Sequence, residues 1–340
     1  MRVNFRIVDV PMTHSEHPYT QLTPETVMDA IESLGYLCDA RNIALNSYEN
    51  RVYQIGIEED VPIIAKFYRP DRWSAAAIRE EHAFCLQLQE EEIPVVAPLV
   101  IHGQSLHHWQ GFYFAVYPRR GGHAPELTRL DDLELIGRWV ARLHQVGSWE
   151  SFQHRPAQST ADHLDGWAEQ VLKSGLMPPD YNDVYRSLIR DLATTMNAQF
   201  QPDQHRHIRL HGDMHNGNLL LRDDQLYLVD FDDCYQGLPM QDIWMLLSGS
   251  QDEQRSQLDA IRKGYEVFRP FPYDELRHIE ALRTLRIIKY AAWLCQRWED
   301  PAFPMAFPWL DGHRFWSEHV LTLREQLAAL YNEPLTLFAN

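Results

Sequence analysis

The 340-residue sequence has few cysteines and no long hydrophobic run. Its four cysteines, Cys38, Cys85, Cys234 and Cys295, lie far apart and form no CxxC pair, which excludes a dense disulfide framework and predicts reduced thiols. The first residues carry charges and lack the apolar core of a signal peptide, and no apolar stretch approaches membrane-spanning length. We therefore expect a cytoplasmic protein without a membrane partner.

Positive charge is also scarce. Lysine and arginine number 31 against 48 acidic residues, and the formal net charge of −17 opposes binding to nucleic acids or anionic membranes. Residues 274–298 are rich in arginine and aromatic residues, but on a predicted helix this pattern is more often packing than a nucleic-acid surface. We expect no nucleic-acid partner and a monomer large enough for two lobes.

What the sequence does contain is a predicted β-hairpin flanked by polar residues. Two apolar runs, at 219–221 and 226–229, are separated by turn-prone residues. Asn218 precedes the first run and Asp230 follows the second. Because a hairpin brings its two ends together, we expect these two side chains to share one site.

The loop before the hairpin, His-Gly-Asp-Met-His-Asn-Gly-Asn at 211–218, adds a further carboxylate, Asp213. Phosphoryl transfer needs a positioned nucleophile and cations that neutralise the phosphates. Asp213 can accept the proton of an attacking hydroxyl, while Asn218 and Asp230 can hold a magnesium ion that bridges to the phosphates of ATP. Asp230 thus counts both as a catalytic and as a metal-binding residue.

Simpler interpretations exist for parts of this motif. His211, Asp213 and His215 could form a metal cluster, although no further His, Cys or Glu accompanies them at metal-site spacing. Asp213 alone could be a turn residue, and Asp230 with Asp232 and its neighbour could be a solvated acidic loop. Their joint occurrence around one hairpin favours the phosphotransferase interpretation.

The motif His-Gly-Asp-x-His-x-x-Asn resembles the aminoglycoside phosphotransferase/choline kinase superfamily, a branch of the protein-kinase-like fold. Residues 46–53, 65–70 and 241–247 resemble the bacterial stress response kinase A family, also called YihE or RdoA. The resemblance extends from about Thr23 to the C-terminal helices. It implies a cytoplasmic enzyme that depends on ATP and Mg²⁺ and phosphorylates serine and threonine in proteins, with autophosphorylation included.

We therefore expect an α+β, bilobal protein-kinase-like fold. Residues 1–117 are predicted to form an N-terminal ATP-binding lobe with a flexible leader at 1–20, and residues 118–340 a helical catalytic and acceptor-binding lobe. Pro118 and the glycines that follow mark the boundary. The expected strands are 51–57, 62–68, 93–101 and 111–117, and the expected helices are 23–35, 74–90, 133–147, two within 162–200, 243–247 and 274–298.

The segment 46–50 lies where kinases carry a glycine-rich phosphate loop, yet it contains no glycine. The family resemblance implies that the hydroxyl of Ser47 and nearby backbone amides cover the phosphates instead; an ordinary turn is the alternative. At the end of the last predicted strand of the lobe, backbone groups around Val116 and Tyr117 are expected to bind adenine, because a strand end exposes unpaired amides.

Lys66 lies on an otherwise apolar predicted strand, where a lysine is costly to bury unless it is paired. We predict that it binds the ATP phosphates and pairs with a helix carboxylate; the alternative is an edge lysine that reaches solvent. Both Glu80 and Glu81 are available. Glu81 is preferred because it shares an apolar helix face with Ala77 and Cys85.

Asp242 also has two interpretations. It could cap the helix 243–247, or it could brace the catalytic loop, as the superfamily resemblance implies. Two rival functions stay open as well: a small-molecule phosphotransferase acting on an amino alcohol, sugar or aminoglycoside, and a catalytically inactive nucleotide-binding scaffold. The intact set of Asp213, Asn218, Asp230 and Lys66 argues against the scaffold.

Overall fold

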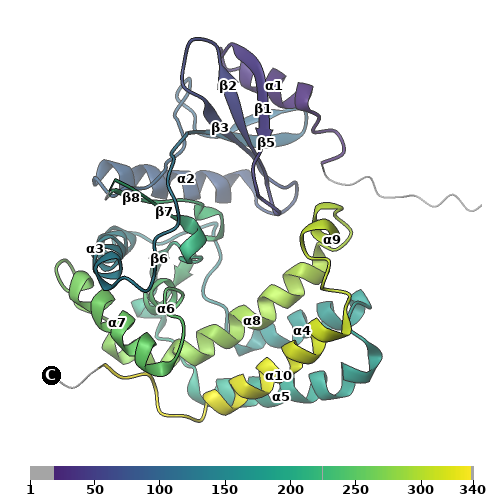
Figure 1. The fold of residues 1–340 in the computed structure, drawn as a ribbon, viewed down its shortest axis with the longest axis vertical. Coiled ribbons are helices and arrows are strands. Elements are labelled where there is room, and N and C mark those ends of the chain that lie inside the picture. Colours follow the sequence, from purple (N-terminus) through teal and green to yellow (C-terminus); the bar gives the residue numbers. More distant parts are fainter. Residues whose placement is uncertain (1–18, 224, 338–340) are drawn as a thin grey trace, which may run out of the picture.

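The computed structural model describes residues 19–223 and 225–337. A β-sheet with one helix on it forms one end of the molecule, and a larger group of helices forms the other, with α2 running across the junction (Figure 1). The expected α+β, two-lobed architecture is confirmed. The leader predicted at 1–20 lies outside the described residues except for its last two, of which Tyr19 is buried.

The sheet has five antiparallel strands in the order β1-β2-β3-β5-β4. Helix α1 packs on it through Val27 and Ile31, and begins as the sequence predicts, with the Thr23 side chain accepting from the backbone N–H of Thr26. The strands are β1 (Cys38–Ala44), β2 (Arg51–Ile57), β3 (Ile63–Phe67), β4 (His107–Trp109) and β5 (Phe112–Pro118), and α1 spans Pro24–Glu32.

The strand expected at 93–101 is wrong. This segment makes only isolated bridges, and the fifth strand of the sheet is β4 instead. The reason is that Pro94 and Pro98 have no N–H to donate to a ladder. The segment still positions other elements, because Val96 N–H donates to the carbonyl of Leu228 and so ties it to the predicted hairpin.

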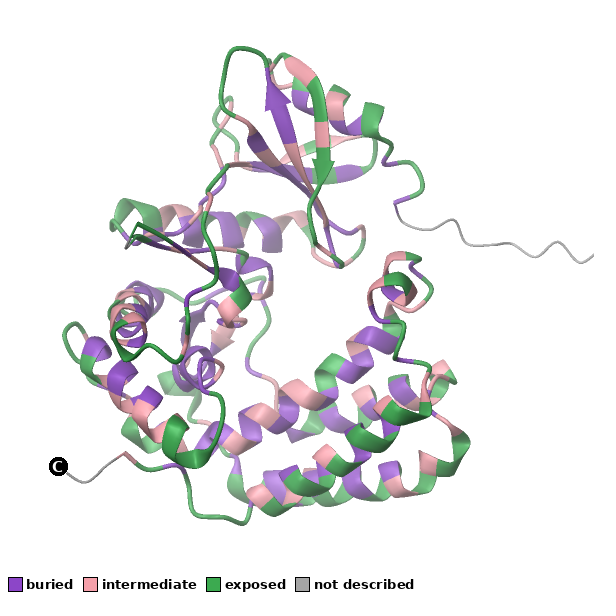
Figure 2. Cartoon of the chain, viewed as in Figure 1, coloured by how far each residue is buried: buried purple, intermediate pink, exposed green. Residues whose placement is uncertain are grey.

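The helices predicted for the larger lobe are present, whereas the helices at 251–265, 302–306 and 313–329 were not predicted. Two helices flank Pro178 and Pro179 as predicted, while the helix expected at 274–298 begins later, after a 3₁₀ turn at Tyr273–His278. The bounds are α2 (Ala75–Glu90), α3 (Leu130–Gly147), α4 (Leu164–Ser174), α5 (Asn182–Gln199), α6 (Met240–Trp244), α7 (Gln251–Tyr265), α8 (Ile279–Gln296), α9 (Ala302–Ala306) and α10 (His313–Ala329). Figure 2 shows that the buried residues lie where these helices face one another.

Two short strand pairs lie beside the helices. The hairpin β7 (Leu219–Arg222) and β8 (Gln225–Leu228) confirms the prediction, with Leu219 opposite Leu228. The strands β6 (Ile208–Leu210) and β9 (Tyr235–Gly237) pair with each other, and the loop at 211–218 and the hairpin lie between them in the sequence. Because the hairpin pairs Leu219 with Leu228, the polar residues that precede and follow it lie at the same end of the hairpin.

The junction between the lobes is packed by α2. Its Phe84 ring contacts Phe152 and Phe231 edge-on, with centroids 5.5 Å and 6.0 Å away. β5 ends at Pro118, next to the predicted lobe boundary, which stays a prediction. Among the described residues, no helix has both the length and the apolar character needed to span a bilayer.

Candidate active site

A cleft of about 890 Å³ opens between the sheet and the helical lobe. Its lining includes residues 45–50, β3, α2, the end of β5, the catalytic loop at 211–218, the segment 229–235, and helices α4 and α8. The structure brings seven of the eight predicted site residues to this cleft, namely Ser47, Lys66, Glu81, Tyr117, Asp213, Asn218 and Asp230.

Val116 is the exception because it does not line the cleft, and a part for its backbone in adenine binding stays a prediction. Its side chain is fully buried in the sheet, and its carbonyl accepts the N–H of Leu99. A carbonyl that is already bonded within the fold is a poor partner for adenine. The cleft is lined instead by the next two residues, Tyr117 and Pro118.

The catalytic loop is held in place by Asp242. Both of its carboxylate oxygens accept backbone N–H groups, from His211 at 2.9 Å and Gly212 at 2.8 Å. Gly212 has φ of 82°, and a side chain there would meet the carbonyl of Asp233, so glycine is required at this turn. Because α6 begins at Met240, Asp242 lies inside the helix and acts as a brace rather than as its cap.

Asp213 projects from this loop into the cleft. Its carboxylate lies 2.6 Å from the guanidinium of Arg286 and 3.4 Å from the ring of His215. The side-chain amide of Asn218 donates to the Asp213 carbonyl at 2.9 Å. Burial would raise the pKa of Asp213, but the contacts with His215 and Arg286 outweigh it and hold the pKa below its usual value. Asp213 is therefore ionised, as a proton acceptor must be.

The alternative metal cluster around His211 is not formed. The His211 ring donates to the carbonyl of Val229 at 2.9 Å and packs on Phe231, so its role is to fix the loop against the hairpin. Within residues 19–223 and 225–337, no group of three or more His, Cys, Asp and Glu side chains is placed to bind a metal ion alone.

Lys66 is buried among three carboxylates. Its ammonium lies 3.0 Å from Asp230, 3.3 Å from Asp232 and 3.9 Å from Glu81. Burial would lower the pKa of Lys66, but these carboxylates outweigh it and keep the pKa well above the usual value. The lysine is thus a permanent cation in the cleft and does not reach solvent as an edge residue.

The choice between Glu80 and Glu81 is resolved by their directions. Glu81 faces Lys66 and pairs with Arg155, and burial raises its pKa above the usual range. Glu80 points the other way and accepts the backbone N–H groups of His154 and Arg155, each at 2.8 Å. One glutamate therefore orients the lysine while its neighbour fixes a loop.

The burial of Asp232 among cationic side chains was not predicted from the sequence. Asp232 is only 3% exposed and pairs with Arg72 as well as with Lys66, while Arg155 donates to its backbone carbonyl at 2.8 Å. The surrounding cations outweigh burial and lower its pKa. No local pattern distinguishes this buried aspartate from a solvated one, because its partners lie more than 70 residues away in sequence.

Asp230 and Asn218 suit a magnesium ion. The Asp230 carboxylate is 55% exposed and faces the cleft, and its residue has φ of 62°, a left-handed conformation that aspartate tolerates. Since the amide nitrogen of Asn218 donates to Asp213, its amide oxygen is the atom left to face a cation. Mg²⁺ prefers such oxygens and is typically bound by one or two protein groups together with phosphates.

The loop at 46–50 is tied to the far lobe, in a contact that we name the interlobe tie. Glu49 accepts from Trp293 and pairs with Arg297 at 2.9 Å. Asp300, beyond α8, pairs with Arg51 at 3.0 Å and with a second arginine from the sheet lobe, Arg69. The loop carrying Ser47 is thus fastened over the cleft from the helical side.

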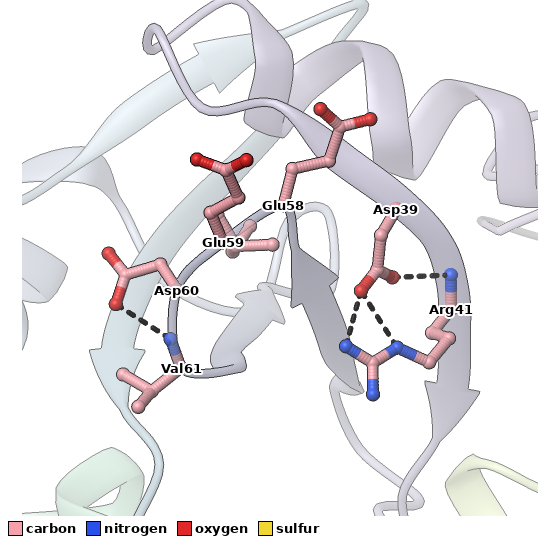
Figure 3. Close-up of a pocket in the computed structure, with 7 residues that line it drawn as sticks. Asp39, Arg41, Glu58, Glu59, Asp60 and Val61 are labelled. Atoms are coloured by element: carbon pink, nitrogen blue, oxygen red, sulfur yellow. Dashed lines mark hydrogen bonds and ion pairs between the residues drawn. The ribbon is translucent and has the colours of Figure 1, made fainter.

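A second hollow lies at the other end of β1 and β2 (Figure 3). There Asp39 pairs with Arg41 and Asp60 accepts the backbone N–H of Val61, while Glu58 and Glu59 are exposed (Figure 3). The carboxylates of this hollow either bind neighbouring groups or face solvent. The residues with a candidate chemical role therefore lie in the cleft between the lobes.

Fold and cleft together define a kinase-like phosphotransferase. Residues 41–279 match the model of the phosphotransferase enzyme family, APH. The chain is 42% identical to stress response kinase A of Escherichia coli and 41% identical to the serine/threonine protein kinase RdoA of Salmonella typhimurium, in each case over 96% of this chain and 99% of the relative. The chain belongs to the stress response kinase A family within the phosphotransferase enzyme family.

Solved structures agree on the fold. The amicoumacin kinase hAmiN, in complex with AMP-PNP, Ca²⁺ and Ami, superimposes with a TM-score of 0.68 at 19% identity, over 89% of this chain and 92% of that one. A microcompartment-associated aminopropanol kinase superimposes with a TM-score of 0.66 at 17% identity, over 91% and 100%. The resemblance expected from the sequence is confirmed.

Proposed function

We propose that the protein is an ATP- and Mg²⁺-dependent serine/threonine protein kinase of the stress response kinase A type. The observation that carries the proposal is that Lys66, Asp230, Asn218 and Asp213 meet in one cleft. A protein acceptor is supported by the relatives named as kinases of this type, which match nearly the whole chain. In this proposal residues 1–117 bind ATP and residues 118–340 carry catalysis and acceptor binding.

ATP lies between the two lobes. Its adenine contacts the strand end at Tyr117 and Pro118, and its phosphates extend toward Lys66 beneath the loop with Ser47. Glu81 and Asp232 hold the lysine in position, so its charge meets the phosphates with little reorganisation. Asp230 and Asn218 would hold a magnesium ion, which would supply positive charge against the transferring phosphoryl group.

Asp213 acts on the acceptor. A serine or threonine hydroxyl oxygen forms a bond to the γ-phosphorus while the bond from that phosphorus to the β–γ bridging oxygen breaks and ADP leaves. The hydroxyl proton passes to the Asp213 carboxylate, which is ionised and therefore free to accept it. The chain's four unpaired cysteines fit a reducing compartment, and we propose that the enzyme works in the cytoplasm as a monomer.

The test is label transfer from radioactive ATP with Mg²⁺, using the protein itself and a generic protein as acceptors. Asp213→Asn should keep ATP binding while lowering the rate by about 10²–10⁴-fold, the usual contribution of a general base. The matched control is Asp223→Asn, because this aspartate is 88% exposed on the hairpin turn and should leave the rate unchanged.

Two results would contradict the proposal. Label found only on added amino alcohols, sugars or aminoglycosides would make the protein a small-molecule phosphotransferase. ATP binding without any transfer would make it an inactive scaffold.

A further inference from the structure

One wall of the cleft differs in charge from the rest of the molecule. Helices α4 and α8 form this wall, and the residues that line it include Trp167 and Gln170 from α4 and Arg286, Lys289 and Tyr290 from α8. Among the described residues of these two helices that line the cleft, every charged one is basic. This is unexpected in a chain whose net charge is −17.

The two basic residues are placed to act together. Arg286 and Lys289 are three residues apart on α8, so they project from the same face of the helix. Arg286 contacts Asp213 at 2.6 Å, which places the basic wall directly beside the proton acceptor. The side chain of Lys289 is exposed, and no ion pair within the described parts of the chain engages it.

From this arrangement we infer that the cleft selects a serine or threonine flanked by acidic residues, which pair with Arg286 and Lys289. The inference rests on the proposed kinase function and names the chemistry of its protein acceptor. Cationic acceptors are disfavoured because they would meet like charge at this wall.

Arg286 gives the selection a mechanism. In the structure its guanidinium covers the Asp213 carboxylate, which the acceptor hydroxyl must reach. Arginine has five N–H donors, so an acidic residue beside the acceptor can take up part of the guanidinium and leave an Asp213 oxygen for the hydroxyl. A neutral segment offers no such replacement partner.

The aromatic residues suit a peptide as well. Tyr290 is 39% exposed and packs on Trp293, with ring centroids 5.7 Å apart. Together with Trp167 these rings line the cleft with apolar surface beside the basic pair. A peptide can place apolar atoms on the rings and carboxylates on Arg286 and Lys289.

The experiment compares kcat/KM for three synthetic peptides that share a central serine and differ only in flanking glutamate, glutamine or lysine. The full-length enzyme should prefer the glutamate peptide over the glutamine peptide by about two- to fivefold, the size of an ion pair at a partly exposed site. Lys289→Glu should reverse the preference toward the lysine peptide and leave the KM for ATP unchanged. Lys263→Glu on α7, an exposed lysine outside the cleft lining, is the control and should keep the original preference.

The outcomes separate the inference from the function on which it rests. Equal use of the three peptides, or an unchanged preference in Lys289→Glu, would overturn the acidic acceptor while leaving a protein kinase. Glycerol phosphate is included as a small anionic alcohol. Label on glycerol phosphate with none on any peptide or protein would overturn both.

Discussion

The brace under the catalytic loop provides the sharpest test of the site's construction. Asp242 is fully buried and accepts three hydrogen bonds, from the backbone N–H groups of His211 and Gly212 and from the ring of His144. Burial lowers the pKa of His144, so this ring is neutral and donates through Nε2 while Nδ1 accepts from Tyr265. We therefore predict the effect of Asp242→Asn, which has the same shape but one oxygen fewer.

The size of the effect follows from these bonds. In the least damaging orientation the asparagine oxygen still accepts the hydrogen bonds from the His211 N–H and the His144 ring. Its NH₂ group then faces the N–H of Gly212, which loses its acceptor. A buried donor left without an acceptor costs about 1–3 kcal/mol, and two bonds to a charged acceptor that become neutral cost about 1 kcal/mol each. The total is about 3–5 kcal/mol. For a chain of this length that lowers Tm by about 4–7 °C.

The effect on catalysis should exceed the effect on folding. Gly212 directly precedes Asp213, so displacement of the loop moves the proton acceptor, and a shift of about 1 Å can cost about 10²-fold in rate. The assay combines thermal unfolding with initial rates measured well below Tm, where the variant is folded. Asp274→Asn is the control, since that side chain is 66% exposed and should change stability by less than about 0.5 kcal/mol. A stable Asp242→Asn variant with the full rate would refute the brace.

Two further predictions concern stability and nucleotide binding. Glu275 is buried and accepts the N–H of Met240, and burial raises its pKa from 4.5 to about 7. The folded state thus keeps a proton that the unfolded chain releases, and stability falls as pH rises between these values, by up to about 3 kcal/mol. Glu275→Gln should gain that amount over wild type between pH 5 and pH 8 in urea unfolding; a constant difference would exclude this titration. Glu49→Gln, which weakens the interlobe tie, should raise the KM for ATP about tenfold through loss of charged hydrogen bonds, whereas the exposed Glu58→Gln should not. An unchanged KM in Glu49→Gln would separate the tie from nucleotide binding.

The parts of the site that could be predicted are those set by local periodicity. The hairpin follows from two apolar runs around a polar turn, and it brings Asn218 and Asp230 to one end. The helical repeat of α2 likewise favours Glu81 over Glu80 as the residue that faces inward. In both cases the spacing along the chain determines the direction of the side chain.

The parts that could not be predicted depend on contacts between distant segments. Asp232 is buried because Arg72 and Arg155 come from other elements to neutralise it, and Arg286 reaches Asp213 from a helix more than 70 residues later. The false strand at 93–101 has a different cause. Its apolar residues suit a sheet, but its prolines remove the donors that a ladder requires.

The interlobe tie has a consequence for turnover. Glu49 and Asp300 are both buried and join the two lobes, so the lobes can move apart only when these ion pairs separate. We expect opening of the lobes, rather than bond breaking at phosphorus, to set the pace of each cycle. Weakening the interlobe tie would then speed the release of ADP even as it weakens the binding of ATP.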